Sequence, residues 1–198
     1  LPALQIYDMK TAAAPYANPI IFLFMGGFML ALAMEKWKLH RRIALTIVRF
    51  TGTNANGIIL GFMLATAFLS MWISNTATTV MMLPIGVSVI DLLRSVQQEP
   101  SVKAGSTAFA ISMMIGIAYA ANFGGTATII GTPPNVVFSG FIEQTYDMEI
   151  SFASWISFAL PFALILLLLT YFTLTRVIFP YRLGRFQGAQ ELIRSQLK

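Results

Sequence analysis

The chain has 198 residues, of which 57% are hydrophobic and only 11% are charged. A soluble domain of this length carries about 25% charged residues, so the charge here is too sparse for a water-facing surface and favours a bilayer as the solvent. The net charge of +5 is accordingly attributed to the basic loops of a membrane protein, not to a nucleic-acid-binding surface, and the absence of cysteine excludes disulfides.

The first predicted span is 16–34, which contains no charged residue. A basic cluster follows it directly, made up of Lys36, Lys38, His40, Arg41 and Arg42. Residues 43–50 have an amphipathic pattern, which predicts a short helix lying in the membrane interface. Because the chain opens with LPALQIYDMK and lacks an initial Met, we expect it to be part of a longer protein.

Two apolar runs, 57–73 and 80–93, flank the polar sequence SNTATT. The second run has about 14 residues, or about 21 Å at about 1.5 Å per residue, which is shorter than the roughly 30 Å core of a bilayer. The lengths favour a re-entrant helical hairpin, 57–93, whose tip at 74–79 lies near the middle of the membrane.

The next predicted segment, 107–142, is a transmembrane helix broken at the sequence GTPPN. An acidic loop with Glu143, Asp147 and Glu149 follows it. The last predicted span is 152–179, and a basic tail, 181–198, closes the chain. The sequence therefore predicts an all-α integral membrane protein with several spans.

The distribution of lysine and arginine predicts the orientation in the plasma (inner) membrane. The loop 35–56, both ends of the hairpin and the tail 181–198 are expected in the cytoplasm, and the acidic loop outside. Lys10 is then the only basic residue on the outer side.

Each polar break ends one helical arm with free carbonyls, which suit a cation, and begins another with free N–H groups, which suit an anion. Ser74, Asn75 and Thr76 are all favourable N-cap residues. At the second break Thr132 can cap the helix while Pro133 takes the first helical position. Broken helices at membrane depth are tolerated where they line a cavity, and paired breaks point to a transporter binding site.

An uncharged oxygen site for sodium is predicted where the breaks meet. Ser70 lies four residues before Ser74, so that on a helix both hydroxyls share one face. These hydroxyls, Asn75 and the carbonyl of Gly131 form the predicted ligand set, with Thr132 and Asn135 as further candidates. No carboxylate lies near either break, which favours sodium over a divalent cation. A bound cation would offset the charge of an anion that binds second.

These features also have other interpretations. Ser and Thr in membrane helices often bond only to the preceding turn, and a proline break is often only a kink.

The alternative function is a related antiporter, or an anion or metalloid permease. An antiporter needs a titratable carboxylate in the membrane, and Asp91 is the only acid inside an apolar run. An enzyme is not expected and no catalytic residue is predicted, since the chain has no Cys and one His.

Three stretches resemble the divalent anion:sodium symporter family, which includes sodium-dependent dicarboxylate, citrate and sulfate carriers. They are SMWISNTATTVMMLP (70–84), GGTATIIGTPPN (124–135) and NPIIFLFMGGFMLALAM (18–34). The resemblance implies an inverted-repeat transporter that works as a homodimer in the lipid membrane by an elevator motion, without nucleic acid. It assigns Ser70, Ser74, Asn75 and Gly131 to a sodium site.

The same resemblance places Asn75 and Thr76 on a substrate carboxylate, with Ser74 adjacent. It divides the chain into a scaffold portion, 1–50, and a transport-domain portion, 51–198. Only one Ser-Asn-Thr triplet is present, so the chain corresponds to one half of the inverted repeat, and the second repeat of the same polypeptide is missing.

Overall fold

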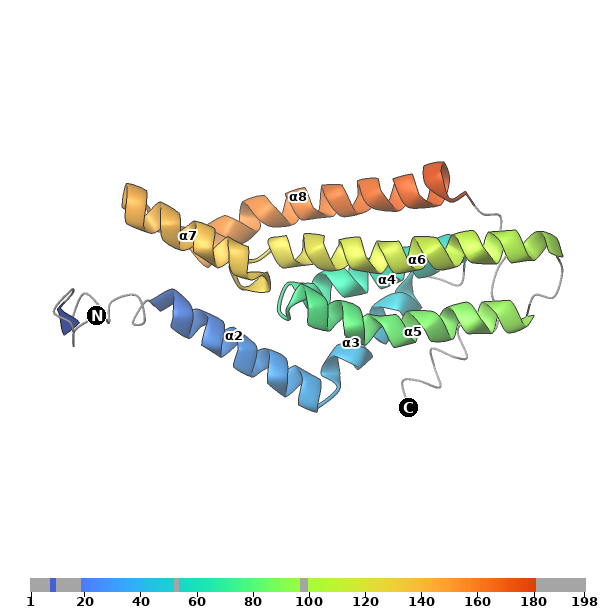
Figure 1. Cartoon of the computed structure of the whole chain (residues 1–198), viewed down its shortest axis with the longest axis horizontal. Helices are drawn as coiled ribbons and strands as arrows, with labels where there is room; N and C mark the ends of the chain where they lie inside the picture. Colours follow the sequence, from blue (N-terminus) through green and yellow to red (C-terminus); the bar gives the residue numbers. More distant parts are fainter. Residues whose placement is uncertain (1–7, 10–18, 52–53, 97–99, 181–198) are drawn as a thin grey trace.

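The computed structural model describes residues 8–9, 19–51, 54–96 and 100–180, and its regular elements within these ranges are all helical. The all-α class is therefore confirmed for the described part of the chain. Helices α4, α5, α6 and α8 run alongside one another, and α2 is inclined to them (Figure 1). Lys10 and the predicted basic tail 181–198 lie outside the described residues.

The first described pair of helices is α2 (Pro19–Lys36) and α3 (Leu39–Phe50). The chain turns between them at Lys38, whose φ of 50° is left-handed. The predicted interfacial segment 43–50 is the second part of α3, which begins four residues earlier. Leu45 on α3 is buried in the core, and α3 packs along α4.

Helices α4 (Ala55–Ser70) and α5 (Asn75–Val96) form a helical hairpin. The break between them is shorter than predicted, because Asn75 and the residues after it are helical. Ser74 caps the start of α5 by accepting the Ala77 N–H at 3.3 Å, and the Thr79 hydroxyl donates to the Asn75 carbonyl at 2.8 Å. The polar side chains thus satisfy backbone groups inside the helix, which is why SNTATT is not a loop.

Helix α5 has 22 residues, or about 33 Å at about 1.5 Å per residue. The prediction of a short second arm, 80–93, is therefore wrong, and length alone does not indicate re-entry. The hairpin nevertheless ends partway along the molecule, since α7 and the start of α8 extend beyond its tip (Figure 1). Met71 at the tip packs with Ala127 and Ala163, and Ala163 lies near the middle of the apolar segment Phe152–Ile178.

The predicted broken helix is observed as α6 (Pro100–Thr126), a short 3₁₀ turn (Ile129–Gly131) and α7 (Pro133–Tyr146). Helix α7 ends at Asp147, which has a left-handed φ of 54° and donates its N–H to the Glu143 carbonyl at 3.0 Å. The chain then returns in α8 (Phe152–Phe172), which continues as a π-helical turn (Thr173–Ile178).

Helix α4 occupies the centre of the bundle and contacts α3, α5, α6 and α8. It is apolar on all sides, as expected for a helix enclosed by others. Its largest fully buried side chains are Ile58, Ile59, Phe62, Met63 and Leu69. The hairpin is therefore held in the core of the described structure, and its tip is positioned by packing.

Among the described residues, two helical segments are long and apolar enough to cross a bilayer: Gly105–Thr126 and Phe152–Ile178. They differ in their surroundings, because only 11% of the most apolar part of Phe152–Ile178 is buried, against 50% for Gly105–Thr126. A long apolar helix with most of its surface exposed is typical of contact with lipid.

Candidate functional site

The two predicted breaks lie against each other at the tip of the α4–α5 hairpin. The Thr128 hydroxyl donates a hydrogen bond of 2.6 Å to the carbonyl of Met71, the C-cap residue of α4, and both residues are buried. Because α4 ends here, the Met71 carbonyl lacks a helical donor among the described residues. The second break supplies that donor and thereby joins the two breaks.

The side chain of Asn75, the first residue of α5, lies at the centre of the junction. Its Oδ1 accepts a hydrogen bond of 2.9 Å from the Ser70 hydroxyl at the end of α4. Its Nδ2 donates to Oδ1 of Asn122 on α6 at 3.2 Å. Ser70 is fully buried and Asn75 is half-buried, so Asn75 connects the enclosed core to the accessible edge of the junction.

Two glycines allow α6 to approach the hairpin tip closely. A β-carbon at Gly124 would overlap the backbone of Ala67 on α4, and one at Gly125 would overlap the side-chain amide of Asn75. Any side chain at these positions would push the helices apart. The sequence stretch Gly124-Gly125 therefore fixes the contact between the end of α6 and Asn75.

Asn135 organises the second break from inside. Its Nδ2 donates to the Gly125 carbonyl at 2.9 Å and to the Thr128 carbonyl at 2.8 Å, and the residue is buried. Gly131 is buried beside the same Gly125 carbonyl. One amide on α7 thus binds the Gly125 carbonyl at the end of α6 and the Thr128 carbonyl before the 3₁₀ turn, which also accepts the Gly131 N–H at 3.3 Å.

The two helix starts at the junction differ in the donors they offer. Pro133 and Pro134 have no N–H, and the Asn135 N–H is bonded to the Thr132 carbonyl at 3.2 Å. The first turn of α7, Pro133 to Asn135, therefore presents no free N–H group, and only the N–H of the N-cap Thr132 has no hydrogen-bond partner among the described residues. At the start of α5, the N–H groups of Asn75 and Thr76 have no hydrogen-bond partner among the described residues.

The structure changes two details of the predicted ligand set. Ser70 and Ser74 do not share a helix face, because α4 ends at Ser70 and Ser74 caps α5; Ser70 is buried and Ser74 is exposed. The glycine in contact with Asn75 is Gly125, and Gly131 in turn contacts Gly125. Thr132 is the N-cap of α7 by backbone conformation, but its side chain makes no capping hydrogen bond.

Three residues that complete the junction are not in the predicted ligand set: Asn122, Gly125 and Thr128. Each lies more than 45 residues from its partner in the hairpin. The small-residue run AYAANFGG before the second break predicts either close backbone approach at the site or an ordinary helix contact, and the close approach is observed at Gly124 and Gly125.

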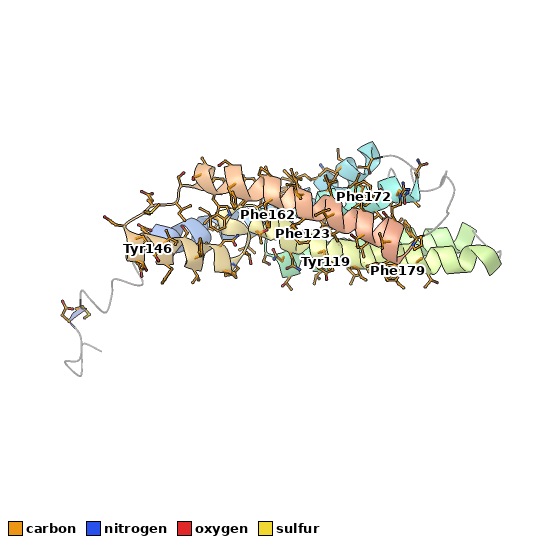
Figure 2. The ribbon with its side chains drawn as sticks, turned by 90° about the horizontal axis from the view of Figure 1, so that it is seen from above. Tyr119, Phe123, Tyr146, Phe162, Phe172 and Phe179 are labelled. Carbon is orange, nitrogen blue, oxygen red and sulfur yellow. The ribbon has the colours of Figure 1, made fainter. Side chains whose placement is uncertain are left out.

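Helix α8 is attached to the junction through Trp155. Its indole Nε1 donates to the carbonyl of Thr126, the last residue of α6, at 3.1 Å, and its ring packs edge-on against Phe138 on α7. Phe123 on α6 and Phe162 on α8, both labelled in Figure 2, line one pocket between these helices. The tryptophan therefore joins the broken end of α6 to α8 and α7.

Comparisons with known proteins give the following similarities. The family model described as citrate transporter matches residues 1–185. The chain is 42% identical over 197 residues to the sodium-dependent dicarboxylate transporter SdcS of Staphylococcus aureus strain USA300. The proteins of that name from strains NCTC 8325 / PS 47 and COL match at the same identity. The chain spans 38% of the length of these relatives, while the alignment covers 100% of the chain.

Proposed function

Since the chain belongs to the citrate transporter family, we propose that it forms one half of a sodium-coupled symporter for di- or tricarboxylate-type or sulfate-type anions. The relatives are named sodium-dependent dicarboxylate transporters, which supports both the coupling ion and the class of substrate. The observation that carries the proposal is the junction itself, where two broken helices meet around the Asn75 amide.

Sodium binds at this junction as a transported ion. The candidate oxygens there are uncharged: the Ser70 hydroxyl and Oδ1 of Asn75 are in contact, Gly125 lies against the Asn75 amide, and Gly131 lies against Gly125. Neutral oxygens suit a hard monovalent cation. The Ser74 hydroxyl completes the set from the N-cap of α5, and Thr132 and Asn135 remain secondary candidates at the second break.

The anion binds at the start of α5. Two free N–H groups, those of Asn75 and Thr76, combine there with the positive end of the helix dipole. Ser74 and Thr76 are exposed at the same end and supply hydroxyl donors. Sodium beside Asn75 offsets the charge of the anion, so the cation binds first.

We further propose that the α4–α5 hairpin is re-entrant and that its two outer ends face the cytoplasm. Contact between Met71 at the tip and Ala163 near the middle of an apolar span supports a tip at mid-membrane depth. The inverted repeat, the homodimer and the elevator motion follow from the family resemblance. The second repeat of the polypeptide would supply the other side of the anion pocket.

A proton-coupled antiporter is less well supported. Asp91 is exposed on α5, and the 16 residues that separate it from Asn75 correspond to about 24 Å of helix at about 1.5 Å per residue. A carboxylate at that distance does not take part in the junction.

The test is uptake of labelled succinate, citrate and sulfate by the full-length gene product in proteoliposomes, with and without an inward sodium gradient. Sodium-driven uptake of at least one anion is expected, and Asn75→Ala should abolish it. Asn54→Ala is the matched control, because Asn54 is exposed at the far end of α4 and makes no side-chain cap. Uptake that does not depend on the sodium gradient, or uptake by the Asn75→Ala variant, would contradict the proposal.

A further inference from the structure

Asn122 makes two hydrogen bonds that fix the orientation of its own amide. Its Nδ2 donates to the carbonyl of Ala118, one turn earlier in α6, at 3.1 Å. A backbone carbonyl only accepts hydrogen bonds, so the amide nitrogen must point toward Ala118 and the oxygen must point away. The oxygen faces Asn75 and accepts from its Nδ2 at 3.2 Å.

This arrangement determines which end of the Asn75 amide faces the junction. Because the Asn122 oxygen also only accepts, Asn75 must direct its nitrogen toward Asn122 and its oxygen toward Ser70 and Gly125. Ser70 would not enforce this orientation, since a hydroxyl both donates and accepts. Among the hydrogen bonds of the Asn75 side chain, the bond to Asn122 is therefore the one that distinguishes the two orientations.

We propose that Asn122 is a positioning residue for the sodium site, holding Oδ1 of Asn75 toward the cation. The inference rests on the proposed sodium-coupled function. Without Asn122 the Asn75 amide can turn over, and its N–H groups would then face the cation. A partner that orients a ligand in this way typically contributes about tenfold or more to metal affinity.

Two substitutions separate this role from simple packing. Asn122→Leu keeps the number and branching of the side-chain heavy atoms but cannot accept a hydrogen bond. Asn122→Asp keeps an acceptor for the Asn75 Nδ2 and loses only the donor to Ala118, whose carbonyl retains its helical partner. Tyr119→Phe is the control, because Tyr119 is exposed on α6 one turn before Asn122 and its ring stack with Phe123 survives the change.

Sodium binding is measured by intrinsic tryptophan fluorescence of the full-length protein in detergent, titrated with sodium chloride against choline chloride at constant ionic strength. Trp72 lies at the hairpin tip and Trp155 is bonded to the end of α6, so both report on the junction. Sodium dependence of uptake in proteoliposomes and the melting temperature without sodium are measured in parallel.

We expect Asn122→Leu to raise the half-saturating sodium concentration about tenfold or more, with a melting temperature close to that of the unaltered protein. Asn122→Asp should bind sodium within about twofold of the unaltered protein, or more tightly through its added charge. Either of two results would overturn this inference without affecting the proposed function. One is a sodium affinity of Asn122→Leu equal to that of the unaltered protein. The other is a sodium affinity of Asn122→Asp as weak as that of Asn122→Leu. An unaltered protein that does not respond to sodium would overturn the proposed function as well.

Discussion

Gly125 has no space for a side chain, because an added β-carbon would overlap the Asn75 amide. Gly125→Ala should therefore displace α6 from the hairpin tip, with a loss of about 1–3 kcal/mol typical of overpacking, and should abolish sodium-dependent uptake. Gly26→Ala is the control, since nothing lies within 4 Å of its added β-carbon. The control should be neutral or stabilising by up to about 1 kcal/mol, as alanine favours helix.

The measurements for this pair are the melting temperature in detergent and sodium-driven anion uptake. Equal melting temperatures and equal uptake for Gly125→Ala and Gly26→Ala would show that the close contact at Asn75 is not needed.

Thr128 and Thr66 offer a second matched pair. Both are fully buried and donate a hydroxyl bond of 2.6 Å to a carbonyl, Thr128 to Met71 and Thr66 to Phe62 one turn earlier in its own helix. Thr128→Val leaves the Met71 carbonyl buried without a donor, which costs about 1–3 kcal/mol. Thr66→Val should cost less, because the Phe62 carbonyl keeps its helical N–H partner.

Melting temperatures of the two variants test this difference directly. If Thr66→Val lowers the melting temperature as much as Thr128→Val does, the hydrogen bond from Thr128 to the Met71 carbonyl has no special role in stability.

The residues of the site could be predicted from sequence only where the chemistry is local. Ser74 follows from capping rules within a few residues, whereas Asn75, an equally favourable cap by sequence, begins the helix itself. Asn122 and Gly125 contact Asn75 from a distant part of the chain, and such contacts are decided by packing between helices. The missing N–H groups at Pro133 and Pro134 were readable from the sequence, because proline lacks this donor wherever it occurs.

At the scale of helices, the hydropathy pattern predicted the order of elements well and their ends less well. The last predicted span, 152–179, matches α8 and its π-helical turn closely, since a proline ends the segment and Ser151 caps its start. The start of α5 was placed too late, because polar residues at a helix start can equally form a turn. Their hydroxyls bond to the helix itself here, which hydropathy cannot reveal.

Trp155 provides a test at the same scale, because it joins α8 to the end of α6. Trp155→Phe keeps an aromatic ring beside Phe138 but removes the donor to the Thr126 carbonyl. We expect faster amide hydrogen exchange in residues 126–135 and a loss of about 1 kcal/mol. Trp72→Phe is the control, since the Trp72 indole makes no hydrogen bond to the described residues.

Exchange is followed by mass spectrometry in detergent. Protection of 126–135 that is the same in Trp155→Phe and Trp72→Phe would mean that α8 does not stabilise the break through this bond.

At the scale of the whole molecule, the predicted family is confirmed by the match over residues 1–185 and by 42% identity to sodium-dependent dicarboxylate transporters. The family and these relatives are transporters, which also confirms the prediction that the chain is not an enzyme. The wide apolar surface of α8 agrees with a membrane location. The predicted orientation remains a prediction, because side-chain packing within one chain does not determine which end faces the cytoplasm.

This chain contains no cysteine, so within it a maleimide can react only with an introduced cysteine, which allows a test of orientation. Trp37→Cys lies between α2 and α3 and Met148→Cys lies between α7 and α8, and both positions are exposed. A membrane-impermeant maleimide applied to intact cells should label Met148→Cys, and it should label Trp37→Cys only in inside-out vesicles. Labelling of both positions from the same side would contradict the proposal that the chain crosses the membrane once between them.

The paired prolines at the start of α7 give the junction an uneven electrostatic field. Two helix starts meet there, yet in the first helical turn only α5 has N–H groups without a partner among the described residues, because Pro133 and Pro134 have none and the Asn135 N–H is bonded to the Thr132 carbonyl. Under the proposed function, one carboxylate of an arriving anion is drawn to a single pole at Asn75 and Thr76. The opposite end of the anion then points away from this chain, so the orientation of the bound anion is determined before the anion makes any further contact.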